Sequence, residues 1–258
     1  RHGPQIVATP RGRAQNQCMS AWVIVGCGYT GTYLARALVG RGDTVTLTRR
    51  DPAAAAELAR QMNGRGRAAD LSDPATLGGL VPAGGIVVCL APPGPDPAAE
   101  LRNLIDASGA ASRIVYVSST GVYPPAAGAW VDETYPVGPT TESGRARVVA
   151  ETALARSTIP WVSLRAAGIH GPGRKLIDRI RAGTHRVIGD GTSHVSRIHV
   201  VDLVAAIVAA GTGTITGFVN VADDDPSPIG EVADTLAARL GVAPSPRVPA
   251  SSVSPEIA

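Results

Sequence analysis

The fold is decided by residues 22–31, which read Trp-Val-Ile-Val-Gly-Cys-Gly-Tyr-Thr-Gly. The apolar run at the start predicts a buried β-strand, and the Gly-x-Gly-x-x-Gly after it is typical of a strand-to-helix turn that holds a dinucleotide. Gly26 would allow the tight turn, and Gly28 would let a pyrophosphate approach bare backbone. Gly31 would let the helix pack closely on the strand. A purely structural glycine turn is the alternative interpretation.

The helix that opens after this turn would present free N–H groups and the positive end of its dipole to the cofactor phosphates. We therefore expect Tyr29 and Thr30, at the start of that helix, to contact the cofactor. Leu90 and Ala91 end a later apolar strand at the point where the cofactor would pass. A role in shaping the site is the alternative for these two residues.

The residues after the second strand bear on the choice between NAD and NADP. A carboxylate about 20 residues beyond the glycine turn would accept the ribose hydroxyls of NAD. This sequence has Arg49 and Arg50 there, and a guanidinium pairs with a 2′-phosphate through a bidentate contact. The arginines predict NADP, with NAD as the alternative cofactor and a solvated basic loop as the alternative role. Asp70 would meet the adenine edge, or would form a turn or helix cap.

Short apolar runs alternate with helix-like segments through the first two thirds of the chain. Strand-like runs lie at residues 22–25, 44–48, 86–90, 114–118 and 161–165. Their nearly continuous apolar character suits a sheet covered on both faces. Asp51-Pro52 and Asp73-Pro74 each offer a helix N-cap followed by proline at the first helical position. This order predicts an α/β fold of the Rossmann type, with a doubly wound parallel sheet.

The chain divides into four predicted parts. Residues 1–18 form a disordered basic extension, and residues 19–168 form an NAD(P)-binding Rossmann domain. Residues 169–242 form a small, discontinuous substrate-binding portion with segments that return to the sheet, including a strand at 218–222 and a last helix ending at Leu240. Residues 243–258, rich in proline and serine, form a mobile tail.

Composition excludes several classes of protein. With 44% apolar and 17% charged residues, the 258-residue chain is not a disordered one. No apolar run approaches the roughly 18 to 20 residues that cross a bilayer, so no membrane partner is expected. Removing Arg1, Arg11 and Arg13 from the 24 basic residues leaves 21, equal to the 21 acidic residues. This neutral body, with 3% aromatic residues, argues against a nucleic-acid partner.

Cysteine usage points to a reducing compartment. Cys18, Cys27 and Cys89 are odd in number and lack Cys-x-x-Cys spacing, so neither a disulfide framework nor a metal site is predicted. We expect a cytoplasmic protein, a monomer or homodimer, whose partner is a small-molecule substrate.

Four further segments, together with the glycine turn, resemble the epimerase/dehydratase-like branch of the extended short-chain dehydrogenase/reductase superfamily. They are Val-Ser-Ser-Thr-Gly-Val-Tyr at 117–123, Arg-Ala-Ala-Gly-Ile-His-Gly-Pro-Gly at 165–173, Arg-Ile-His-Val-Val-Asp-Leu at 197–203 and Phe-Val-Asn-Val-Ala at 218–222. The resemblance covers roughly residues 20–240. It implies a catalytic unit of a strand-end serine, a Tyr-x-x-x-Lys helix and the cofactor. The tyrosine exchanges a proton with substrate, the lysine lowers its pKa and holds the nicotinamide ribose, and the serine orients the substrate oxygen.

Ser119 matches the family serine, but the Tyr-x-x-x-Lys match fails. The helix-like stretch 141–151 has Arg147 at the lysine position and Ser143 where the tyrosine is expected. Arg147 could bridge ribose hydroxyls, but it stays protonated, and a serine hydroxyl has a far higher pKa than a phenol. The standard proton relay is therefore absent, as it often is in an atypical subgroup of the extended family that this sequence resembles.

The proton would then have to come from another group. Tyr123 is the other phenol that the resemblance places near the site, with packing under the substrate loop as its alternative role. His170 and His199 carry imidazoles that titrate in a useful range, although each also fits a loop or core position. Asp132 and Glu133 are adjacent, so their carboxylates would project apart and indicate a solvated loop.

These features predict an NADP-dependent oxidoreductase or epimerase-like protein that acts on a small hydroxyl or carbonyl compound, sugar-derived compounds included. Ser119, Tyr123, Ser143 and Arg147 are the candidate catalytic residues. A non-catalytic NADP-binding sensor or scaffold is the alternative. Serine at position 143 favours the sensor, whereas Ser119 and the complete glycine turn favour the enzyme.

Overall fold

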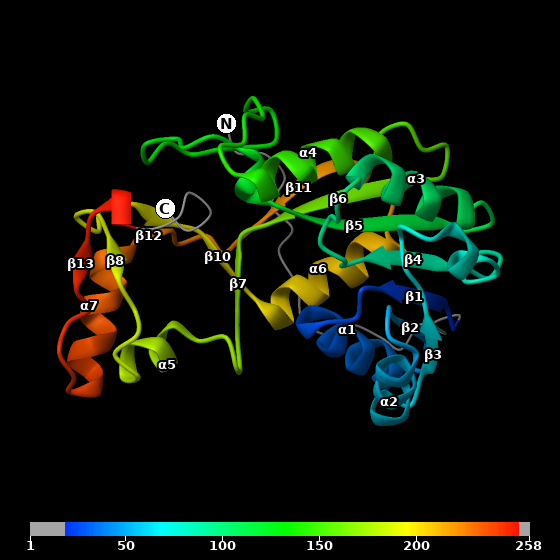
Figure 1. Ribbon diagram of the computed structural model, residues 1–258, viewed down its shortest axis with the longest axis horizontal. Coiled ribbons are helices and arrows are strands. Elements are labelled where there is room, and N and C mark those ends of the chain that lie inside the picture. The colour runs from blue at the N-terminus through cyan, green and yellow to red at the C-terminus, as the bar shows by residue number, and fades with distance from the viewer. Residues whose placement is uncertain (1–18, 253–258) are drawn as a thin grey trace.

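A seven-stranded parallel sheet forms the centre of the computed structural model, which describes residues 19–252 (Figure 1). Its strands are β1 (Ala21–Val25), β2 (Thr44–Arg49), β3 (Arg65–Ala68), β4 (Ile86–Cys89), β5 (Arg113–Ser119), β6 (Trp161–Ala166) and β11 (Gly217–Val221). The spatial order is β3-β2-β1-β4-β5-β6-β11, so the order reverses between β1 and β4. The predicted Rossmann-type fold is confirmed, and each strand predicted by residue range lies within one residue of its expected bounds.

Helices cover both faces of this sheet (Figure 1). One face is covered by α1 (Tyr29–Gly40), α2 (Pro52–Met62) and α6 (Val200–Thr212), and the other by α3 (Pro97–Ala107) and α4 (Glu142–Leu154). Alternate side chains of β1 enter the two cores: Trp22 and Ile24 pack with the first set of helices, and Val23 and Val25 with the second. All four are buried, which explains why the strand has no polar position.

Aspartate-proline pairs begin three elements. The Asp51 carboxylate accepts the N–H of Ala54 (2.6 Å) and caps α2, as predicted. Asp96 caps α3 in the same way, a signal that the sequence analysis did not use. The helix expected after Asp73 is a single 3₁₀ turn, η1 (Pro74–Leu77), which corrects that prediction. It stops because two glycines follow it, the second of them, Gly79, with a left-handed φ of +63°.

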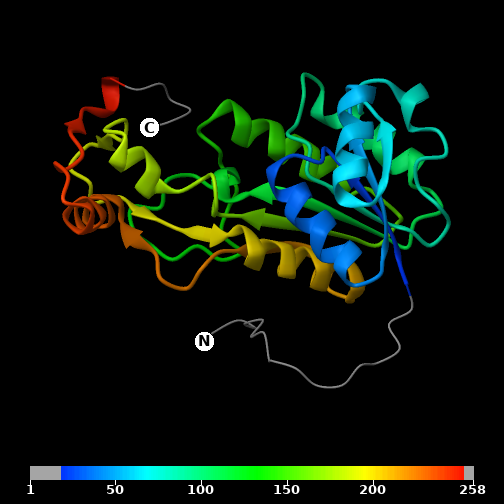
Figure 2. The ribbon, with the colours of Figure 1, turned by 90° about the horizontal axis from the view of Figure 1, so that it is seen from below.

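A smaller portion lies at one end of the molecule, and β2, β3 and α2 lie at the other (Figures 1 and 2). It contains α5 (Leu176–Arg181), α7 (Ile229–Leu240) and two short strand pairs, β8 (Val187–Ile188) with β13 (Arg247–Val248) and β9 (His194–Val195) with β12 (Ser227–Pro228). The parallel pair β7 (Gly168–His170) and β10 (Arg197–His199) lies between it and the sheet. Two short 3₁₀ turns complete the structure, η2 (Thr120–Val122) and η3 (Ala250–Ser252).

Residues 243–252 belong to this smaller portion, which corrects the prediction of a mobile tail from residue 243. The hydroxyl of Ser245 lies 2.9 Å from Nδ1 of buried His185. Arg247 pairs with Asp234 of α7 (2.7 Å). The rest of the predicted tail, and the predicted extension at 1–18, lie outside the described residues. Within the described part of the chain, no helix has the length and apolar character needed to cross a membrane.

Helix α6 packs on the sheet through a glycine. Gly211, in the last turn of α6, lies against the indole of Trp22, which is only 1% exposed. A Cβ at Gly211 would overlap that ring and lie 3.2 Å from Cγ2 of Ile86. In contrast, a Cβ at Gly40, the last residue of α1, would have no neighbour within 4 Å. The two helical glycines therefore differ in burial and in whether space for a methyl group exists.

Gly211→Ala should lower the free energy of unfolding by about 1–3 kcal/mol because the added methyl group overpacks the Trp22 site. Gly40→Ala is the matched control and should raise stability by up to about 1 kcal/mol, the helix-propensity advantage of alanine. Urea unfolding followed by circular dichroism measures both. Equal stability of Gly211→Ala and wild type would show that α6 can shift away from Trp22 without cost.

Candidate functional site

The glycine turn lies where the strand order reverses, between β1 and α1. Gly26 has a φ of +75°, and a Cβ there would lie 2.6 Å from the backbone N and Cα of Ala91. A Cβ at Gly31 would lie 2.9 Å from Sγ of Cys27 and 3.2 Å from Cδ1 of Leu90. At Gly26, the positive φ and the nearby end of β4 therefore exclude a side chain. At Gly31, close packing against Cys27 and Leu90 excludes one. Both conformational roles predicted from the sequence are observed.

Gly28 lies on the open side of the same turn. A Cβ there would meet nothing nearer than the carbonyl oxygen of Gly26, at 3.9 Å. Gly28 is the N-cap of α1, and no side chain caps this helix end. The N–H of Thr32 is bonded within the helix, to the Gly28 carbonyl (3.0 Å), and the three preceding N–H groups lie at the uncapped end. Bare backbone and a positive helix end fit the pyrophosphate of a dinucleotide.

Strand β2 fixes the position of the turn. The Thr48 hydroxyl accepts the N–H of Gly26 (3.2 Å), and the Thr48 carbonyl accepts the N–H of Cys27 (3.0 Å). Burial raises the pKa of the Cys27 thiol to about 11, an effect that the charge of Arg49 partly opposes. The thiol is therefore neutral at neutral pH and does not repel phosphate. Thr48 was not among the predicted site residues, although its hydroxyl at the end of an apolar strand was a signal for this role.

Arg49 and Arg50 are exposed at the carboxyl end of β2. Arg49 acts on the pKa of Cys27, which places its charge near the glycine turn, and Arg50 acts on the pKa of Asp70. Oδ1 of Asp70 accepts the N–H (3.0 Å) and hydroxyl (2.8 Å) of Ser72, and these bonds lower the pKa of the carboxyl. Arg49, Arg50 and Asp70 thus lie near one another at the carboxyl-terminal edge of the sheet. Asp70 has the turn-forming role that was its alternative.

Tyr29 connects the glycine turn to the smaller portion. Its phenol donates to the carbonyl of Pro172 (3.0 Å), and the Arg174 guanidinium lies 4.5 Å from the centre of its ring. The side chain is therefore engaged with loop 171–174, a role that the sequence did not predict. Thr30 is buried. The backbone N–H groups of Tyr29 and Thr30 are the groups left for the predicted cofactor contact.

Ser119 and Arg147 come together at the end of β5. The Ser119 hydroxyl accepts the N–H of Gly121 (3.1 Å) and caps the short turn η2. Arg147, on α4, donates from Nη1 to the carbonyl of Val117 (3.0 Å). Ser143 lies one turn earlier on α4 and is exposed to solvent. Arg147 thus contacts β5 at Val117, close in sequence to Ser119 at the end of the same strand.

A second phenol, that of Tyr116, lies within electrostatic range of Arg147. Burial raises the pKa of Tyr116, and the opposing effect of the Arg147 charge is smaller. Tyr116 packs in the core formed by β5, α3 and α4. A phenol that is buried and held protonated cannot exchange a proton with a substrate, so Tyr116 does not replace the missing tyrosine.

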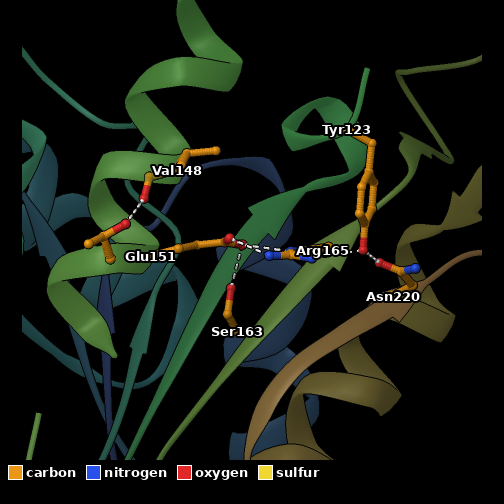
Figure 3. Close-up of polar contacts among 7 residues, drawn as sticks. Tyr123, Val148, Glu151, Ser163, Arg165 and Asn220 are labelled. Carbon is orange, nitrogen blue, oxygen red and sulfur yellow. Dashed lines mark hydrogen bonds and ion pairs between the residues drawn. The ribbon is translucent and has the colours of Figure 1, made fainter. Parts of the chain in front are cut away.

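Tyr123 is part of a buried polar network centred on Arg165 (Figure 3). Nη1 of Arg165 donates to the Tyr123 oxygen (2.8 Å), and Tyr123 donates to Oδ1 of Asn220 (2.8 Å). Arg165 also donates from Nε to Oε1 of Glu151 (3.1 Å) and from Nη2 to Oε2 (2.8 Å). The phenol already donates its proton and accepts a charged hydrogen bond. This arrangement favours the packing role for Tyr123.

The network joins elements that are far apart in sequence. The Arg165 and Glu151 side chains, 4% and 3% exposed, connect β6 to α4. Asn220 connects β11 to the insert 124–139, because its backbone N–H donates to Glu133 (2.7 Å) and its side chain donates to the carbonyl of Val131 (3.2 Å). Glu133 therefore anchors the insert and does not form an acid/base pair with its neighbour. The sequence signal for this network was a charged residue inside the apolar run of β6.

His170 and His199 lie side by side on the paired strands β7 and β10, with ring centres 5.2 Å apart. Nδ1 of His199 accepts the N–H of Val201 (3.3 Å), so a neutral His199 ring carries its proton on Nε2. Burial, followed by the neighbouring His199, lowers the pKa of His170. Among residues 19–252, no cluster of three or more histidine, cysteine or acidic side chains is arranged to hold a metal ion.

Comparison with known proteins gives one family match and one curated relative. A family model described as NAD(P)H-binding matches residues 26–210. The 3-diazoavenalumate denitrifying reductase of a Streptomyces species is 32% identical over 119 residues. That alignment covers 44% of this chain and 39% of the reductase, so the chain matches well under half the length of this relative.

Two solved structures resemble almost the whole chain. A conserved protein of unknown function from Silicibacter pomeroyi is 30% identical with a TM-score of 0.78, and the match covers 93% of this chain and 86% of that one. A candidate NAD-dependent epimerase/dehydratase from Methylobacillus flagellatus is 28% identical with a TM-score of 0.70, covering 91% and 90%. Both similarities extend through the smaller portion as well as the sheet.

Arg165→Met should lower the free energy of unfolding by about 3–5 kcal/mol, because it leaves the Glu151 carboxylate buried without its partner. The double variant Glu151→Leu/Arg165→Met removes both charges and should recover most of that loss. Chemical unfolding of the two single variants and the double variant measures the coupling. Arg181→Met breaks an exposed pair with Asp178 and serves as control, with an expected change below about 1 kcal/mol. Additive single effects would contradict the network.

Proposed function

The chain belongs to the NAD(P)H-binding family, and on that premise we propose that it is an NADP-dependent oxidoreductase or epimerase-like enzyme acting on a small hydroxyl or carbonyl compound. The matched family and the similar structures confirm the resemblance to NAD(P)-binding, epimerase/dehydratase-like proteins. Membership of the atypical subgroup stays a prediction. The observation that carries the proposal is the shape of the glycine turn. Neighbouring atoms leave no room for a side chain at Gly26 and Gly31, whereas the backbone at Gly28 is free of close neighbours. The nicotinamide cofactor, when bound, supplies hydride transfer.

The preference for NADP is supported by charge at the end of β2. Arg49 and Arg50 are the residues at the position where an NAD-binding protein of this fold has a carboxylate. Both are exposed, and neither forms an ion pair with another described residue. A 2′-phosphate would therefore gain two cations without displacing an existing partner.

The chain's own residues would divide the chemical work as follows. Ser119 orients the reacting oxygen of the substrate, and Arg147 holds the nicotinamide ribose at the same strand end. The proton is exchanged at the imidazole of His170 or His199, since the phenols of Tyr123 and Tyr116 are both committed to buried structure. The lowered pKa of His170 keeps that ring neutral near pH 7, where it can accept a proton.

A non-catalytic NADP-binding sensor remains the second candidate function. Two observations favour it. The position aligned with the family tyrosine is an exposed serine, Ser143, and the nearby Tyr123 phenol is satisfied by Arg165 and Asn220. A protein with this site would bind the cofactor and respond to its redox state without turning over a substrate.

Replacing Arg49 and Arg50 with glutamine should weaken NADPH binding by about 10–100-fold, on the scale of one to two charge-assisted hydrogen bonds. NADH binding should change less than about threefold, because NADH lacks the 2′-phosphate that the arginines contact. Calorimetric titration of each nucleotide measures both effects.

Two further variants make that titration decisive. Arg36→Gln removes an exposed cation from the outer side of α1 and should leave both affinities unchanged. Gly28→Val fills the open side of the glycine turn and should abolish binding of both nucleotides. Equal weakening of NADPH and NADH by the arginine replacements would contradict the NADP assignment. Unchanged binding in Gly28→Val would contradict the cofactor site itself.

Ser119→Ala should separate the enzyme from the sensor. A screen of NADPH oxidation against aldehydes, ketones and nucleotide sugars would first identify a substrate. Loss of a hydrogen-bond donor to the reacting oxygen should then lower turnover by about 100-fold, with NADPH affinity nearly intact. Ser118→Ala, which removes the adjacent buried hydroxyl, is the control and should keep its turnover. Unchanged turnover in Ser119→Ala would remove Ser119 from the mechanism, and failure of the whole screen despite NADPH binding would favour the sensor.

A further inference from the structure

A cleft of about 810 Å³ lies between the paired strands β7 and β10 and the helices α5 and α7. Its volume is within the usual range for a site that takes a small molecule. The two histidines, His170 and His199, lie in its wall, and so does Gly171 of the loop that Tyr29 holds. The cleft therefore adjoins the glycine turn through one shared contact.

The charged side chains of this cleft are almost all cationic. Four cations line it, Arg174, Lys175, Arg179 and Arg197. The one carboxylate in the lining, that of Asp178, already pairs with Arg181 outside the cleft (3.3 Å). None of the four cations forms an ion pair with a described residue. The lining thus has more cations than carboxylates, a charge excess that an anion would reduce.

Arg197 gives this charge a defined position. Its Nη2 is buried and has no hydrogen-bond partner among the described residues. A buried donor on a charged group normally has a hydrogen-bond partner. Without one, the group loses its bond to water on burial and gains nothing in return. Asp223 accepts the backbone N–H of Arg197 (3.3 Å), not a guanidinium N–H. Burial and then His199 lower the pKa of His170; the Asp223 carboxylate opposes this shift and the Arg197 charge adds to it, so both charged groups lie near the histidine pair.

Other residues of the lining are apolar. Leu176 of α5 and Leu236 of α7 pack on the small core of this portion and are only half-buried, and they face the cleft together with Val232. A ligand that covers these side chains would remove apolar surface from water, which is favourable at about 25 cal/mol per Å². The cleft therefore offers an apolar surface and cations to one ligand.

The lining is poor in the neutral polar side chains that commonly recognise sugars. No residue that lines the cleft carries a hydroxyl or a carboxamide. Sugar and nucleobase edges are normally recognised by such neutral polar groups, because these donate and accept hydrogen bonds in fixed directions. The hydroxyls of a nucleotide sugar would have to be met here by the two histidines and by charged side chains.

We propose that this cleft binds an organic carboxylate with an apolar body, and that this compound is the substrate of the protein. The carboxylate pairs with Arg197 and Arg179, and the apolar body lies on Leu176, Val232 and Leu236. The substrate role rests on the function proposed above, whereas the anion site does not. The histidine pair at the edge of the cleft then stands next to the bound compound.

Binding of trans-cinnamate, measured by calorimetry with and without saturating NADPH, tests the proposal. Cinnamamide has the same shape without the charge and should bind at least about tenfold more weakly, the scale of a lost charge-assisted contact. UDP-glucose, tested in the same way, represents the nucleotide sugars and should not compete with cinnamate.

Charge variants locate the site. Arg179→Gln and Arg197→Met should each weaken cinnamate binding by about tenfold or more. Arg186→Gln removes a cation outside the cleft, shortly after α5, and is the matched control with unchanged affinity. All three variants should retain NADPH binding. Arg197→Met should keep or raise the melting temperature, because it removes a buried unpaired donor, and a structural arginine would not behave in this way.

Each outcome bears on one proposal or the other. NADPH binding without cinnamate binding, equal binding of cinnamamide, or UDP-glucose binding that depends on Arg197 would overturn the carboxylate site and leave the cofactor assignment intact. Cinnamate binding that depends on Arg179 and Arg197 in a protein that does not bind NADPH would support the anion site and overturn the proposed function. Cinnamate affinity unchanged in both cleft variants would place the anion elsewhere and overturn the proposal.

Discussion

The close approach of the end of β4 to the turn after β1 is the constraint on which the site depends. The backbone of Ala91 lies where a Cβ of residue 26 would be, so the turn needs glycine with a left-handed φ. Thr48 ties the same turn to β2. Strands on both sides therefore hold the turn rigidly, and rigidity lets the uncapped N-terminus of α1 point at one place. Ala91 and Thr48 occupy the other sides of the turn, so Gly28 faces its one open side.

The buried Arg165–Glu151 pair connects β6 to α4 and also engages Tyr123. A guanidinium buried in β6 must have its donors filled, and Glu151 and Tyr123 fill them. The pair thus determines the fate of the Tyr123 phenol, which is drawn into the network together with Asn220. Since α4 also carries Arg147, the network positions that residue relative to the end of β5. One ion pair therefore supports the helix that carries Arg147 and engages the Tyr123 phenol.

Local patterns predicted the fold, and contacts between distant segments account for what they missed. Apolar runs predicted the sheet because burial on both faces leaves few polar positions. The element after Asp73 was predicted to be longer than it is. The Asp-Pro cap indicates only where a helix begins, whereas the glycines that follow determine where this one ends. For Tyr29, the sequence indicated proximity to the cofactor and contained no sign of its bond to Pro172, 143 residues later. Likewise, Arg165 inside an apolar strand signalled a buried partner but could not identify it.

The contact between Tyr29 and loop 171–174 links the two halves of the site. Gly171 has a φ of +152°, and a Cβ there would lie 2.6 Å from the Tyr29 oxygen, so the loop passes too close for any other residue. Arg174, one of the cleft cations, lies on the Tyr29 ring. The helix end that would meet the cofactor phosphates and the loop that lines the cleft thus share one side chain. Because Tyr29 begins α1, its hydrogen bond to Pro172 and its contact with Arg174 hold the helix end and the cleft loop next to each other.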